Sequence, residues 1–84
     1  MVRTGNPMDT KDQIRDRIER AIPGARVEVT AAGGGHFSIV VVAAAFAGLS
    51  LLEKQRLVYG AIADLMRGDN PPVHAVDQLV TRTA

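Results

Sequence analysis

Apolar residues recur with helical spacing near the start of the chain. Isoleucines occupy every fourth position in the range 14–22, which predicts an amphipathic helix with one buried stripe. Thr10 precedes Gln13 by three residues, a spacing typical of a capping box at a helix N-terminus. The Pro-Gly pair at positions 23–24 then ends the pattern. The first predicted element is therefore a helix from about Thr10 to this pair.

Two extended segments follow this helix. In residues 25–30, valines alternate with charged residues, which indicates a strand with one buried face. The segment "HFSIVVV", from His36 to Val42, is apolar at nearly every position after its histidine, which is typical of a more covered, central strand. The connection between them, Thr30 to Gly35, is short and rich in glycine. We therefore expect the two strands to be antiparallel neighbours.

A second helix and a third strand complete the pattern. Ser50 and Glu53 have capping-box spacing, and the helix is expected to run to about Arg67, with Gly68 as its stop. The β-branched stretch "VHAVDQLVT", residues 73–81, predicts the last strand. On a helical wheel, one predicted buried face of the second helix carries Leu51, Val58, Ile62 and Leu65.

The element order predicts an α+β fold of the type αββαβ. Because a helix connects the second and third strands, they should be parallel if adjacent, which gives a three-stranded mixed sheet. Both helices are expected on one face, opposite an exposed sheet surface. His36 opens the second strand and His74 nearly opens the third, so both histidines should lie at the same end of the sheet.

Composition narrows the class of protein. The chain has 84 residues, a formal net charge of +1 and no cysteine. This length suits one domain, at 9–84, preceded by a disordered leader at 1–8. The charge gives no sign of the strongly basic field of non-specific nucleic-acid binding. No apolar run approaches the roughly 20 residues of a membrane span, so we expect a cytoplasmic protein with no membrane attachment.

The two histidines are the candidates for metal binding. His74 can act as an imidazole ligand or as a strand-edge residue bonded to a backbone carbonyl. His36 can likewise act as a ligand, or it can cap the glycine loop by hydrogen bonding. That loop precedes a strand, whereas a phosphate cradle leads into a helix N-terminus, so its glycines predict flexibility or positive φ rather than nucleotide binding.

No arrangement of catalytic residues is evident. The aspartates at positions 12, 16, 64 and 77 are scattered over different elements without an indicated pairing. The outer face of the second predicted helix carries charges of both signs, which is typical of a solvated surface. It also includes Gly60, which is unusual in a helix interior. Tyr59 could stack on a base or on a partner side chain. We therefore expect that the protein is not an enzyme.

Four motifs follow one another along the chain: "HFSIVVV", the "F.G.S" of residues 46–50, the "KQRLVY" of residues 54–59 and the "VHAV" of residues 73–76. In their order and spacing the chain resembles the BolA-like proteins, and it is most similar to their IbaG-type bacterial branch. The resemblance extends from Lys11 to Val80. It implies a fold similar to class II KH domains, although the GxxG loop with which KH domains grip nucleic acid is absent.

The resemblance also implies a partner and a shared cofactor. BolA-like proteins bind monothiol glutaredoxins, and a [2Fe-2S] cluster is shared between the glutaredoxin cysteine, glutathione and histidine of the BolA-like chain. The histidine of the "HA" pair, here His74, is the ligand that such proteins carry most consistently. The chain by itself would bind no cluster and would be a monomer or a weak homodimer. Candidate contacts to a partner or to nucleic acid are Gly33, Gly34, Gly35, Lys54, Arg56 and Tyr59.

This sequence departs from the family pattern in three places. The loop from Thr30 to Gly35 has no Cys or His where relatives often carry a second ligand, so His36 is the remaining imidazole near it. The usual "RHR" reads "KQR" at Lys54, and a tail with tryptophan and further basic residues is absent.

Two other roles stay open. One is a DNA-binding regulator, whose affinity would fall steeply with salt. The other is a purely structural partner that would bind apo glutaredoxin without either histidine.

Overall fold

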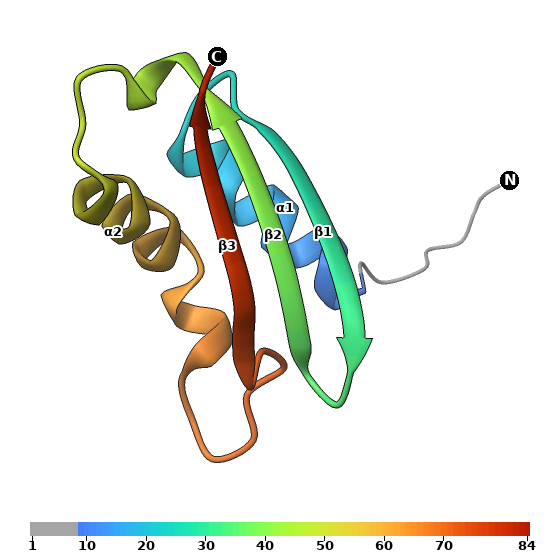
Figure 1. Cartoon of the computed structure of the whole chain (residues 1–84). Helices are drawn as coiled ribbons and strands as arrows, with labels where there is room; N and C mark the ends of the chain where they lie inside the picture. Colours follow the sequence, from blue (N-terminus) through green and yellow to red (C-terminus); the bar gives the residue numbers. More distant parts are fainter. Residues whose placement is uncertain (1–8) are drawn as a thin grey trace, which may run out of the picture.

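The computed structural model describes residues 9–84, so the leader expected at 1–8 lies outside the described residues. Two α-helices, two short 3-10 helices and three strands follow one another along this part of the chain (Figure 1). Within residues 9–84, no helix has the length and apolar character needed to cross a membrane. The elements are α1 (Thr10–Ala21), β1 (Arg26–Gly33), β2 (His36–Ala43), η1 (Ala44–Phe46), α2 (Leu51–Ala61), η2 (Ala63–Met66) and β3 (Ala75–Thr83).

The strands form one mixed sheet in the order β1-β2-β3. β1 pairs antiparallel with β2, and β2 pairs parallel with β3. Both helices lie on one face of the sheet, and the other face is open to the viewer in Figure 1. The predicted α+β fold, its αββαβ order and its mixed sheet are therefore confirmed.

The hydrophobic core lies between the sheet and the helices. Alternate residues of β2 point into it, which is the alternation expected for a strand covered on one face. Helix α1 contributes its isoleucine stripe, and the remaining core residues come from the segments around α2, η2 and the start of the last strand. The buried residues are Ile14, Ile18, Ile22, Phe37, Ile39, Val41, Ala43, Phe46, Val58, Ile62, Leu65 and Val73.

The two helix starts differ in how they are capped. Ser50 and Glu53 form the predicted capping box, with the Ser50 side chain accepting from the Glu53 amide and the Glu53 carboxylate accepting from the Ser50 amide. At α1 the prediction was wrong by one residue. Asp9 is the N-cap and accepts from the amide of Asp12 at 3.0 Å, so Thr10 is the first helical residue. A carboxylate is also a better match than a hydroxyl for the positive end of the helix dipole.

The second helix is shorter than the sequence indicated. It ends at Ala61, and a 3-10 segment, Ala63–Met66, replaces its expected last turn. This change still places Leu65 in the core, but Leu51 is 62% exposed rather than buried. A helical wheel gives the direction of a side chain around the axis and not the length of helix that the core covers. Leu51 is the first residue of α2, and the core does not cover this end of the helix.

An ion pair connects η2 to α1. Arg17 of α1 donates from Nε to Asp64 Oδ2 at 3.0 Å. This hydrogen bond, with the charge of the guanidinium, holds the pKa of Asp64 below its ordinary value. Asp64 thus has a basic partner that the sequence did not indicate. The contact links α1 to η2 at the protein surface.

Candidate functional site at one end of the sheet

The hairpin between β1 and β2 forms the centre of the candidate site. Gly33 pairs with His36, which leaves Gly34 and Gly35 as the two turn residues. Their φ angles are +64° and +80°, and a type I′ turn requires positive φ at both of these positions. β1 is accordingly longer than predicted and ends at Gly33. These glycines thus form a tight turn, and the positive φ predicted for the loop is confirmed.

The last glycine of this turn holds the segment that carries His74. The carbonyl oxygen of Gly35 accepts from the backbone amides of His74, at 2.8 Å, and of Ala75, at 3.1 Å. The imidazole also lies against the glycine, since a Cβ built on Gly35 would be 2.5 Å from His74 Cδ2. Gly35 is therefore the residue that makes room for the His74 ring.

The residue before His74 is fixed from the other side. Val73 is 1% exposed, and its amide donates to the carbonyl of Leu65 at 3.1 Å. The side chain of His74 is exposed, although both neighbouring backbone segments are held by hydrogen bonds. β3 begins at Ala75 rather than at the predicted residue 73, so His74 stands just before the strand. The site thus presents a solvent-accessible imidazole on an ordered backbone.

His36 lies at the same end of the sheet, as predicted, because it pairs with Ala75 of β3. Its Nδ1 atom lies 2.9 Å from Oδ1 of Asp77. An ionised carboxylate can only accept, so Nδ1–H is the donor and the neutral ring has its lone pair on Nε2. Within residues 9–84, no three His, Asp or Glu side chains converge as a metal site. The structure thus brings two imidazoles to one end of the sheet, called the rim below, and a carboxylate orients one of them.

Asp77 reaches His36 through an irregularity in β3. The register between β2 and β3 shifts so that Phe37 pairs with Val76, whereas Ser38 pairs with Gln78. Asp77 is the extra residue of a bulge, a feature that redirects side chains out of the regular alternation. In the sequence this aspartate has no indicated partner, and no local signal marks the bulge. Asp77 is therefore the site residue that the sequence missed.

The other predicted contact residues fall into two groups. Gly33, Gly34 and Gly35 lie at the histidine end, in or beside the hairpin turn. Lys54, Arg56 and Tyr59 lie on α2, which runs beside β3 rather than at the hairpin end in Figure 1. The hydrogen bonds found at the rim involve none of these three side chains. The structure therefore separates a rim site from a helix surface, and both contact roles remain predictions.

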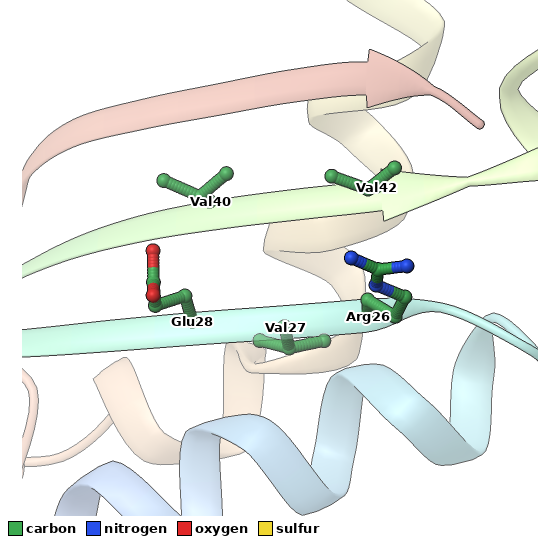
Figure 2. A pocket seen from close by; sticks show the side chains of 5 residues that line it. All are labelled: Arg26, Val27, Glu28, Val40 and Val42. Atoms are coloured by element: carbon green, nitrogen blue, oxygen red, sulfur yellow. The ribbon is translucent and has the colours of Figure 1, made fainter.

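A shallow hollow on the sheet lies away from the histidines. It has a volume of about 230 Å³, and Figure 2 shows its lining residues on β1 and β2. Arg26 pairs with Val42 at the end of the hairpin opposite the Gly33–His36 pair. Glu28 and Val40 continue the open face between these ends. This hollow therefore belongs to a different part of the molecule from the imidazoles.

Comparisons of the sequence point to one family. The family described as BolA-like protein matches residues 14–84. BolA-like protein 1 of Homo sapiens is 36% identical over 72 residues, which cover 75% of this chain and 50% of the human protein. The chain thus spans about half the length of the curated relatives it matches.

Solved structures have the same fold. The BolA domain of SufE1 from Arabidopsis thaliana is similar with a TM-score of 0.74 and 26% identity, over 93% of this chain and 95% of that domain. BolA1 from Arabidopsis thaliana has a TM-score of 0.75 at 19% identity, over 92% and 94% of the two chains. The second similarity concerns the fold alone.

Proposed function

Because the chain belongs to the BolA-like family, we propose that it is an accessory protein of iron-sulfur cluster assembly or trafficking. In this role it binds a monothiol glutaredoxin and shares a [2Fe-2S] cluster with it. In this role the chain catalyses no reaction and supplies imidazole ligands to the cluster. The observation that carries the proposal is the exposed His74 ring on Gly35, at the same end of the sheet as His36.

The ligand chemistry requires a partner. A [2Fe-2S] cluster needs four protein or thiol ligands, and this chain offers two imidazoles and no thiolate. Glutaredoxin cysteine and glutathione would supply the sulfur ligands, and His74 would supply nitrogen. An imidazole that replaces a thiolate raises the reduction potential of a cluster. The mixed complex would therefore exchange electrons at a different potential from an all-thiolate site.

His36 has the arrangement found in many metal-binding histidines. Such a histidine donates its second ring N–H to a carboxylate or carbonyl, which fixes the ring and the tautomer. The Asp77 carboxylate occupies that position at Nδ1, 2.9 Å away, so Nε2 is the atom available to the cluster. We assign Asp77 a positioning role in this proposal, since it acts through His36 and contacts no cluster itself.

We expect a coloured one-to-one complex when the chain is mixed with a monothiol glutaredoxin, glutathione, iron and sulfide. Its visible absorption and circular dichroism should differ from those of the glutaredoxin homodimer, because nitrogen replaces sulfur at one iron. Analytical gel filtration with iron and sulfide analysis gives the stoichiometry. A mixture that retains the homodimer spectrum, with this chain eluting separately, would contradict the proposed function.

The role of Asp77 has its own test, which needs no cluster. At about pH 8 an ordinary imidazole is neutral, and the ring nitrogen shifts of His36 in NMR spectra report the tautomer. We expect mainly the Nδ1–H form in the native chain and in Asp77→Asn, whose side-chain carbonyl can still accept. Asp77→Ala should shift the population toward Nε2–H. An identical tautomer ratio in Asp77→Ala would remove the positioning role while leaving the His74 ligand untouched.

A further inference from the structure

The exposed large apolar side chains of residues 9–84 are all concentrated on one helix. Leu51, Leu52, Leu57 and Tyr59 are 62%, 54%, 42% and 38% exposed, and all four belong to α2. Leu52 and Tyr59, seven residues apart, share one flank of α2 and Leu57 lies on the other flank, whereas Leu51 is at the start of the core-facing side. In Figure 1 this helix lies beyond the free edge of β3. The α2 surface is therefore the strongest candidate for a contact outside the rim site.

The centre of this surface carries charges that can complement themselves. Val58 and Ile62 point into the core, so the side of α2 opposite them faces outward. Glu53, Arg56 and Gly60 follow one another at spacings of three and four residues and form a single stripe on that side. The backbone amide of Ser50 donates to Oε1 of Glu53, so Oε2 of that carboxylate is available to a cation. The stripe thus carries one acidic side chain, one basic side chain and a glycine.

We propose that a second copy of this chain docks on α2, with the two α2 helices antiparallel across a two-fold axis. The axis repeats each contact, so Glu53 faces Arg56 of the second copy and Arg56 faces Glu53 of the second copy. In the same register, Leu52 lies near Tyr59 of the second copy. Opposite charges and apolar pairs therefore fall together in one alignment, which favours a second copy over an unrelated partner.

A hollow beside the stripe fits this arrangement. Leu49, Glu53, Arg56 and Leu57 line a mainly apolar depression of about 350 Å³. A two-fold axis perpendicular to the helices keeps each flank of α2 opposite the same flank of the other copy. Leu57 of the second copy then lies at the level of Leu52 and faces this depression. Each copy thus places one leucine in the hollow of the other.

Gly60 leaves room for the second copy, because in this register it lies level with Leu49, just before α2 of the second copy. A Cβ built on it would meet nothing within 4 Å, so packing within the chain does not require glycine there. Gly60 is the penultimate residue of α2, and the lack of a side chain there lets another backbone approach. The facing surface is only an 11-residue helix, so the dimer should be weak and concentration-dependent.

Sedimentation equilibrium of the full chain from about 10 μM to about 1 mM tests the proposal. We expect a monomer–dimer equilibrium that Arg56→Glu weakens at least about tenfold, because each attractive pair becomes repulsive. Arg26→Glu, with the same charge change on β1, is the matched control and should leave dimerisation unchanged. A monomer at every concentration overturns the proposal, as does a dimer insensitive to Arg56→Glu.

A charge swap tests the register directly. Glu53→Lys alone should also dissociate the dimer, but an equimolar mixture with Arg56→Glu should form a heterodimer, since both cross-pairs are again opposite in sign. Should Glu53→Lys fail to fold without its capping box, Gly60→Gln replaces it. Glutamine favours the helix and fills the approach site, so this variant should resist urea better and dimerise less. A Gly60→Gln chain that dimerises normally overturns the proposal.

Discussion

Replacing Gly35 with alanine is expected to lower the free energy of unfolding by about 2–3 kcal/mol. The residue has φ +80°, a conformation that side-chain-bearing residues rarely adopt, and the new Cβ would be 2.5 Å from His74 Cδ2. Nearby atoms Cγ and Cβ of His74, at 3.0 and 3.1 Å, leave the ring little freedom to swing aside. Relief of the clash therefore requires the start of β3 to move. Urea unfolding followed by far-UV circular dichroism measures the loss.

Gly34→Ala is the matched control in the same turn. Gly34 also has positive φ, +64°, but a Cβ there would lie 3.9 Å from His36 Cδ2, an ordinary contact. This variant should have the backbone strain without the clash, a cost of about 1 kcal/mol. The His74 ring signals in NMR spectra should shift in Gly35→Ala and stay nearly unchanged in Gly34→Ala. Equal destabilisation in the two variants would mean that Gly35 does not position His74.

Replacing His74 with alanine is expected to abolish the spectral difference between the mixed cluster complex and the glutaredoxin homodimer. The reason is that His74 would supply the nitrogen ligand, and the chain has no cysteine that could substitute for it. The His74 side chain is exposed, so its loss should change the free energy of unfolding by no more than about 0.5 kcal/mol. Visible circular dichroism of the reconstituted mixture, with urea unfolding of the variant, separates loss of the ligand from loss of the fold.

His36→Ala is the comparison for this experiment. His36 is at the same rim and is also exposed, so the two variants remove the same group from neighbouring positions. We expect a smaller change or none in His36→Ala, since the resemblance to BolA-like proteins points first to the histidine of the "HA" pair. A spectrum that His74→Ala leaves intact would reject the ligand role. It would favour a purely structural partnership or the DNA-binding alternative.

Much of the fold could be predicted because its signals are local. The isoleucine stripe of α1, the alternation in β2 and the Ser50–Glu53 capping box each depend on residues within about two helical turns. Topology then placed His36 and His74 at one end of the sheet, since a helical connection makes the flanking strands parallel. The errors were at element ends. Asp9 replaces Thr10 as the cap through an equally local contact with the Asp12 amide, and α2 stops at Ala61, where the 3-10 segment η2 follows after one residue.

The sequence by itself determined the element order, the buried faces of most elements and the shared rim of the two histidines. Only the tertiary structure decided which residues orient them. The Asp77 contact with His36 joins residues 41 positions apart and depends on a bulge in β3, which no local pattern marks. Gly35 likewise contacts His74 only because the hairpin turn meets the start of the last strand. Such contacts follow from the register between strands, which is set by packing of the whole sheet.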